Sequence, residues 1–276
     1  MEQIIKLMTK RNYERKILSN DDIKKISLMI IKLKRYELYV ENIIFSKKDE
    51  GNTVATYDGN ELCFYKNGLD YLKSCSTNDG SLEGSRVDLI NFQILSSIFH
   101  EFAHVRQFLM SESYSGSEAK IYRICEKLYN IDNFYINNYE IMPNEINAFA
   151  LGNLNAYKIY QNIPNNIVNI HDKNIYKSIV IDIILSEYMV DLNKEIIKSP
   201  SELLLDRLKN YDLSKINLNY EKIDSIIKSF KDYSLYHKLL VGMPISFENY
   251  AYVNMYRDNN DYNNDYTFIK KFQKRK

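Results

Sequence analysis

SSIFHEFAHVRQFL, residues 96–109, is the stretch of the sequence that decides the fold. It contains a His-Glu-x-x-His pattern formed by His100, Glu101 and His104, and most of its other residues are apolar. Residues four apart lie on one face of an α-helix, so the two histidines can offer their imidazoles to one metal ion while Glu101 is held beside them. The pattern therefore predicts a metal-binding helix, which we place at about residues 86–110.

A catalytic zinc ion needs a third protein ligand and an open position for water. Gln107 and Met110 stand three and six residues after His104, where the extended metzincin pattern has glycine and histidine, so that variant is excluded. The third ligand must then come from a later helix. The carboxylates at a reachable separation are those of Glu118, Glu126, Glu140 and Glu145.

Glu145 is the best candidate among these carboxylates. Pro143 and Asn144 mark the start of a predicted helix that continues to about Tyr160, and Glu145 falls in its first turn. Small residues continue the same helical face three, seven and eleven positions on: Ala148, Gly152 and Ala156. They would let this helix approach the active-site helix closely. We predict Glu145 as the third ligand and keep Glu140 as the alternative, because a first-turn carboxylate also favours a helix without any metal.

The chain as a whole is predicted to be an α+β protein that is mainly helical. It has only 4 prolines and 8 glycines in 276 residues, which is few for a strand-rich fold. Short β-branched or aromatic runs predict strands at 42–45, 53–57 and 62–65, with Asp58-Gly59-Asn60 as a hairpin turn. Other helices are expected from Ser19 to about residue 33 and at 118–129, 173–197, 201–208 and 220–240, with loops at 76–85 and 111–117. We expect a catalytic core over residues 1–160 and a helical C-terminal subdomain over residues 161–276.

The composition limits the classes of partner. The 37 basic and 36 acidic residues nearly cancel, so no overall field attracts nucleic acid or an anionic membrane, and we expect neither as a partner. No apolar stretch is long enough for a membrane helix, and the N-terminal residues do not form a secretory signal. With three scattered cysteines, these features predict a cytoplasmic protein. The sequence does not reveal the oligomeric state.

The motif resembles that of the zincin metallopeptidases, and the order of the predicted elements is similar to the gluzincin type, whose third ligand is a glutamate on a later helix. Glu145-Ile146-Asn147-Ala148, followed by Phe149-Ala150, resembles the Glu-x-x-Ala element of the cytoplasmic ImmA/IrrE-like metallopeptidases. The resemblance covers about residues 20–160. It implies a zincin-like fold, with a small twisted sheet and an edge hairpin beside the active-site helix. It also implies a peptide or protein substrate that lies along an edge strand, either 53–57 or 62–65.

The expected activity is zinc-dependent hydrolysis of peptide bonds. A water on one zinc ion held by His100, His104 and Glu145 becomes acidic, and Glu101 is expected to act as general base and proton shuttle. Gln107 could either support the site or only face solvent. Candidates for the group that stabilises the oxyanion are Tyr236, His237 and Arg207. The same ligands can also hold manganese, cobalt or nickel.

Two alternatives remain open at the level of the sequence. One is a non-catalytic regulatory or binding protein that retains a zincin fold, although the intact pattern at His100, Glu101 and His104 counts against it. The other is an effector or toxin protease that acts in another cell. Cleavage of peptides by the purified protein separates the first alternative from an enzyme.

Overall fold

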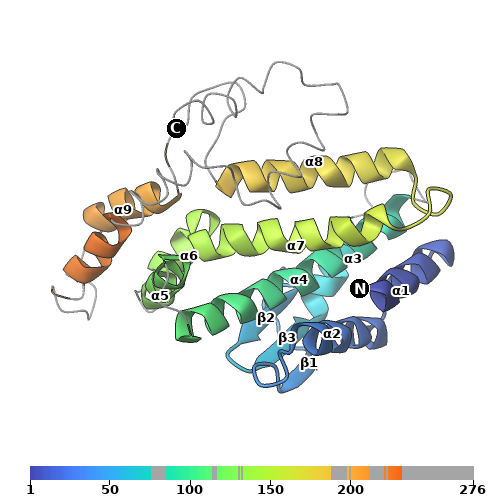
Figure 1. Ribbon diagram of the computed structural model, residues 1–276, viewed down its shortest axis with the longest axis horizontal. Helices are drawn as coiled ribbons and strands as arrows, with labels where there is room; N and C mark the ends of the chain where they lie inside the picture. The colour runs from blue at the N-terminus through green and yellow to red at the C-terminus, as the bar shows by residue number, and fades with distance from the viewer. Residues whose placement is uncertain are drawn as a thin grey trace, which may run out of the picture. The chain divides into compact units, whose positions relative to one another are not determined.

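The computed structural model describes residues 1–75, 85–113, 117–129, 131, 133–187, 198, 200–211, 221 and 223–231. Most of the loop predicted at 76–85 lies outside these residues, as do the parts of two predicted helices beyond residues 187 and 231. Among the described residues the chain is mainly helical and contains one small sheet (Figure 1). The prediction of a mainly helical α+β protein is therefore confirmed.

Helices make up most of the described elements, and three short strands lie between the second and third of them. The helices are α1 (Glu2–Tyr13), α2 (Asn20–Lys34), α3 (Lys66–Cys75), α4 (Ser85–Ser113), α5 (Ser117–Tyr129), α6 (Phe134–Asn137), the 3-10 helix η1 (Tyr139–Ile141), α7 (Pro143–Gln161), α8 (Ile170–Glu187) and α9 (Pro200–Asn210). The strands are β1 (Asn42–Ser46), β2 (Ala55–Asp58) and β3 (Glu61–Tyr65). The loop predicted at 111–117 is partly wrong, because α4 continues to Ser113.

The chain divides into two compact units. One comprises residues 1–109 and 148–180, and the other comprises residues 110–147 and 181–276. The division falls inside α4, α7 and α8, each of which continues across it as one helix. The sequence predicts a functional boundary after residue 160, between a catalytic core and a C-terminal subdomain. This division stays a prediction.

Helix α2 begins where the sequence predicts it, because its first turn is capped. The backbone N–H of Asp22 donates to Ser19 Oγ at 3.2 Å, and the backbone N–H of Ser19 donates to Asp22 Oδ2 at 3.0 Å. This reciprocal pair is a capping box. Arg11 of α1 donates to the other carboxylate oxygen, Asp22 Oδ1, at 2.9 Å, which ties α1 to the start of α2.

The sheet has the order β1-β3-β2, with β3 parallel to β1 and antiparallel to β2. Gly59 has φ +64° in the turn between β2 and β3, a backbone conformation that glycine adopts without steric cost. The predicted hairpin is therefore confirmed. Leu62 and Phe64 of β3 are fully buried, and this strand pairs on both sides, so residues 62–65 are not an edge strand. The edge of the hairpin is β2.

The first unit packs its helices around α4. The Tyr160 hydroxyl of α7 donates to the backbone carbonyl of Asp88 at 2.7 Å, and the ring of Tyr176 on α8 stacks on Phe92 with centroids 4.4 Å apart. Figure 1 shows α7 running along α4, with the sheet on the other side of α4. The ring of Tyr57 on β2 packs edge-on against Phe108 of α4. Helix α4 is thus held between the sheet and α7.

Helices α4 and α7 approach each other closely at Gly152. A Cβ atom there would lie 2.7 Å from the carbonyl oxygen of Ser96 and 3.1 Å from the backbone nitrogen of His100. Ala148 and Ala156, one turn away on either side, are fully buried. The small-residue face predicted for this helix is confirmed, and it lets α7 lie directly on the turn of α4 that carries His100.

We expect Gly152→Ala to destabilise the protein by about 1–3 kcal/mol, because the added methyl group must push two helix backbones apart. The melting temperature, followed by circular dichroism, should fall by several degrees. Asn155→Ala on the same helix is the control, since the Asn155 side chain donates a hydrogen bond to the carbonyl of Leu151 within α7 and to no other residue in the described part of the chain. Because alanine is intrinsically the better helix former, a Gly152→Ala protein that melts at or above the parental temperature would refute the close contact.

The second unit has a separate apolar core. Its buried members come from α5, α6, η1, α9, the helical residues 223–231 and the connections before α6 and after η1: Ile121, Ile124, Cys125, Leu128, Ile131, Phe134, Tyr135, Ile141, Met142, Leu204, Leu205, Leu208, Ile226 and Phe230. The ring of Tyr135 packs in this core, and its hydroxyl donates a hydrogen bond to Glu145. The core therefore holds one of the side chains that surround the predicted third ligand.

A buried acidic pair near the start of α4 links the stability of the first unit to pH. Burial, and then the neighbouring carboxylate of Asp172 on α8, raise the pKa of Asp88 to about 7, while Arg15 opposes the shift. The folded protein therefore binds this proton more tightly than the unfolded chain, in which the pKa of an aspartate is about 3.9. The contribution of Asp88 to stability is fully present below about pH 4 and is lost as the pH rises to about 7.

Asp88→Asn should remove this pH dependence. We expect the variant to gain stability over the parent by up to a few kcal/mol at pH 8, and by much less at pH 5. Thermal unfolding of both proteins at the two pH values measures the difference, with Asp21→Asn at an exposed position as the control for loss of one charge. An equal effect of Asp88→Asn at both pH values would contradict the buried acid.

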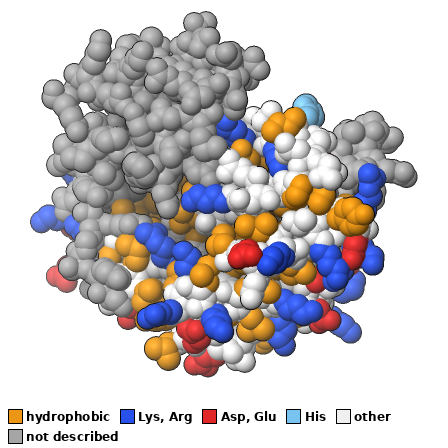
Figure 2. All heavy atoms as spheres, turned by 45° about the vertical axis from the view of Figure 1, so that its right-hand side comes forward, with side chains coloured by type: hydrophobic (Ala, Val, Ile, Leu, Met, Phe, Trp, Pro, Cys, Tyr) orange, Lys and Arg blue, Asp and Glu red, His pale blue; other side chains and the backbone are white. Residues whose placement is uncertain are grey.

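The surface and the helices also bear on the predicted partners. Basic and acidic side chains are interspersed on the described part of the face that Figure 2 displays. Within the described part of the chain, none of the helices combines the length and the apolar character that crossing a membrane requires.

Candidate metal centre

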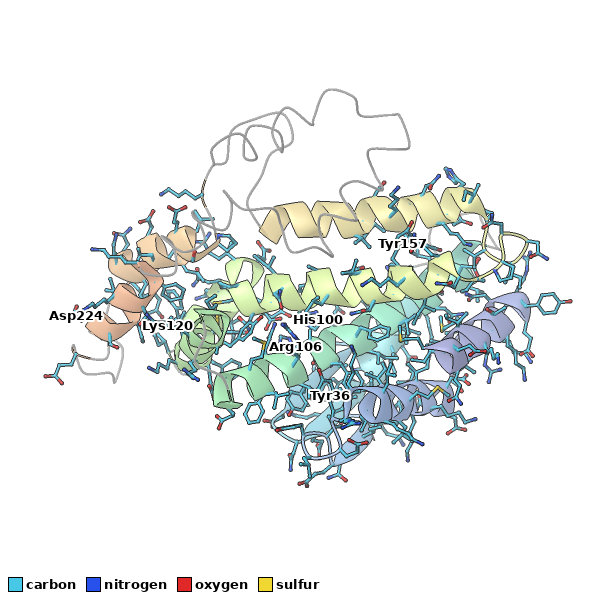
Figure 3. All side chains as sticks on the ribbon, viewed as in Figure 1. Tyr36, His100, Arg106, Lys120, Tyr157 and Asp224 are labelled. Carbon is cyan, nitrogen blue, oxygen red and sulfur yellow. The ribbon has the colours of Figure 1, made fainter. Side chains whose placement is uncertain are left out.

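Helix α4 brings the two histidines together. His100 and His104 lie one turn apart, with ring centroids 4.8 Å apart and their Nε2 atoms 3.1 Å from each other. His100 is only 7% exposed, and Glu101 is 5% exposed. Figure 3 shows His100 on α4, where this helix runs along α7. The spacing in the sequence thus produces two imidazole nitrogens that converge on one point.

Gln107 orients His104. Its Oε1 lies 2.8 Å from His104 Nδ1, and the Gln107 side chain is 4% exposed. Because a carbonyl oxygen can only accept, Nδ1 carries the proton, and Nε2 keeps its lone pair for a metal ion. The sequence leaves open whether Gln107 supports the site or only faces solvent. Its burial and its contact with His104 support the first of these roles.

Helix α7 brings Glu145 to the same place. The Tyr160 hydroxyl donates a hydrogen bond to the carbonyl of Asp88, and Gly152 contacts the backbone at His100. The earlier residue of α7 thus lies beside the later residue of α4, so the two helices run in opposite directions. Glu145 is seven residues before Gly152 on the same unbroken helix. The ligand atoms of His100, His104 and Glu145 all lie within 4.8 Å of one another.

Two donors hold the carboxylate of Glu145, which is 4% exposed. The Tyr135 hydroxyl donates a hydrogen bond to Glu145 Oε1, and Asn144 Nδ2 donates to the same oxygen at 3.1 Å. Burial, and then the charge of Glu145, raise the pKa of Tyr135 far above its ordinary value. Tyr135 therefore keeps its proton at neutral pH and acts as a donor.

The geometry of the group fits a divalent metal ion. Metal–nitrogen bonds of about 2.0–2.1 Å in a tetrahedral site place two ligand nitrogens about 3.3 Å apart, close to the 3.1 Å between the two Nε2 atoms. Two imidazoles and one carboxylate form a donor set that zinc binds in catalytic sites, with a fourth position for water. A buried group of two histidines and one glutamate is thus able to hold a metal ion.

Two of the other candidate carboxylates are described, and neither joins this group. Glu140 lies exposed in η1, and Glu126 lies exposed on α5. The side chain of Glu118 is outside the part of the chain that the structure describes. Among the described candidates, Glu145 is therefore the carboxylate that lies close to the histidines, and its role as a ligand stays a prediction.

The group that would stabilise an oxyanion stays a prediction. Tyr236 and His237 lie outside the described residues. Arg207 is described on α9, and its Nη1 donates to Asn138 Oδ1 at 2.7 Å. The structure thus gives this guanidinium a local partner in its own unit.

The contacts of three side chains near the ligands are not predicted from the sequence. Tyr135 is one of 24 tyrosines, and nothing in the local pattern singles it out. The position of Asn144 could have indicated its contact, because Asn144 directly precedes Glu145 at the start of a helix and its amide can donate to a side chain nearby. Phe149 packs edge-on against the ring of His100, with centroids 4.4 Å apart, although 41% of it is exposed.

Comparisons of the chain with models of known protein families, with curated proteins and with solved structures found no match.

Proposed function

We propose that the protein is a zinc-dependent peptidase of the gluzincin type. The observation that carries this proposal is the buried group of His100, His104 and Glu145, with ligand atoms within 4.8 Å of one another. The general base expected for such an enzyme, Glu101, directly follows one of the ligands on the same helix. A purely structural metal site has no need of a buried carboxylate next to its ligands.

Each residue of the site has a distinct part in the proposed reaction. His100, His104 and Glu145 would hold the ion. When bound, a divalent ion would polarise the substrate carbonyl and make water more acidic. Glu101 takes the proton from the attacking water and returns it to the departing amine. Gln107 keeps the ring of His104 in the orientation and tautomer that the ion requires.

The proposed substrate is a peptide that lies along β2. Strand β2 is at the edge of the sheet, so an extended peptide can add to it through backbone hydrogen bonds. The ring of Tyr57 on this strand packs against Phe108 of α4, the helix that carries the histidines. This contact supports a substrate path beside the site. The order of α2, the sheet, α4 and α7 along the chain supports a zincin-like fold.

Cleavage of a peptide library tests the activity. The purified protein loaded with one equivalent of zinc is expected to cut a defined subset of peptides, identified by mass spectrometry. A chelator should abolish cleavage, and added zinc should restore it. A zinc-loaded protein that cleaves no peptide, yet binds a partner protein tightly, would favour the non-catalytic alternative.

A further inference from the structure

The two oxygens of the Glu145 carboxylate have different surroundings. Oε1 accepts hydrogen bonds from both the Tyr135 hydroxyl and Asn144 Nδ2. An ionised carboxylate has about two acceptor sites on each oxygen. Both sites of Oε1 are therefore engaged, and coordination of a metal ion falls to Oε2.

The direction of each hydrogen bond is fixed by the chemistry of its donor. Asn144 Nδ2 also donates to the oxygen of Tyr135, at 3.0 Å. An amide nitrogen can only donate, so the Tyr135 oxygen accepts from Asn144 and directs its single proton to Glu145 Oε1. The three side chains form a closed arrangement in which the carboxylate cannot rotate about its χ3 angle without losing both donors.

We propose that Tyr135 and Asn144 are positioning residues that make Glu145 a monodentate ligand, bound to the ion through Oε2 alone. The inference rests on the proposed metal function and extends it. With two imidazoles and one carboxylate oxygen, the ion has three protein ligands and retains a fourth position for water. A bidentate carboxylate would occupy one more position and would crowd the water that hydrolysis consumes.

Cobalt spectroscopy tests the proposal without any measurement of activity. Four-coordinate Co²⁺ absorbs visible light more strongly than five-coordinate Co²⁺, so the spectrum reports how many oxygens of Glu145 bind. The variants are Tyr135→Phe, Asn144→Ala and the double variant. Tyr129→Phe is the matched control, since the Tyr129 ring packs on Tyr135 with centroids 4.9 Å apart but its hydroxyl is not bonded to Glu145 in the described contacts. Circular dichroism confirms that each variant is folded.

We expect the parent and Tyr129→Phe to give the strong four-coordinate spectrum with one Co²⁺ per chain. The double variant should bind Co²⁺ with a weaker, five-coordinate spectrum and with an affinity that is lower by roughly 10–100-fold, as is typical when outer-sphere partners are lost. Strong metal binding with the parental spectrum and affinity in the double variant would overturn the positioning role.

The outcomes also separate this inference from the proposed function. A parent protein that binds no Co²⁺ overturns both. A parent that gives the four-coordinate spectrum, shifted in the double variant, but that cleaves no peptide, supports the positioning role and overturns only the peptidase.

Discussion

His104→Ala is expected to lower the affinity for zinc by more than about 100-fold. Loss of an outer-sphere partner alone costs about 10–100-fold, and His104 is proposed as a direct ligand, with its Nε2 3.1 Å from His100 Nε2. Titration against a chromophoric chelator measures the affinity. The stabilisation by zinc should be lost as well, since a ligand at about 100 times its Kd adds about 2.7 kcal/mol to the parent.

His171→Ala is the matched control for this prediction. His171 lies exposed on α8, so its removal deletes an imidazole without touching the proposed site. Zinc should raise the melting temperature of this control as much as that of the parent. If His104→Ala bound zinc as tightly as His171→Ala, the ion would have to be held elsewhere.

Glu101→Gln is expected to reduce kcat for peptide cleavage by about 100- to 10,000-fold while one zinc remains bound. The amide has nearly the same shape as the carboxylate, so the helix and the two histidines keep their positions. It cannot take a proton from water, however, and the hydrolytic step loses its base. Steady-state cleavage of a peptide found in the library, together with metal analysis of the same sample, measures both quantities.

Glu112→Gln controls for the loss of a negative charge on the same helix. Glu112 lies exposed near the end of α4, and this variant should cleave at the parental rate. Cleavage by Glu101→Gln at that rate would mean that another group acts as the base. Loss of zinc from Glu101→Gln would instead give Glu101 a role in metal binding.

The parts of the site that follow from local periodicity can be predicted from the sequence. His100 and His104 share a helical face because they are four residues apart, and this holds in any helix. Glu145 can be found because small residues on its face require a close neighbour, and Gly152 indeed contacts the backbone of α4. The capping box of Ser19 and Asp22 is also a local pattern.

Elements and contacts that depend on distant parts of the chain cannot be predicted in this way. The sequence does not predict helices α1 and α3. In α3 the reason is Gly68, because a glycine inside a helix lowers its intrinsic stability. Tertiary packing explains this glycine, since a Cβ atom at position 68 would lie 1.9 Å from the carbonyl oxygen of Thr53. Glycine is needed there because α3 lies against the backbone before β2. The bond from Tyr135 to Glu145 depends on how α6 and α7 fold together, which no sequence spacing encodes.

A crystal structure of the protein grown with zinc, with anomalous diffraction measured on both sides of the zinc absorption edge, tests the central claim most directly. The account predicts one strong peak within about 2.0–2.2 Å of His100 Nε2, His104 Nε2 and a carboxylate oxygen of Glu145. A zinc peak that lies away from these three side chains would contradict it. So would a structure that has no zinc peak and in which the two imidazoles point apart.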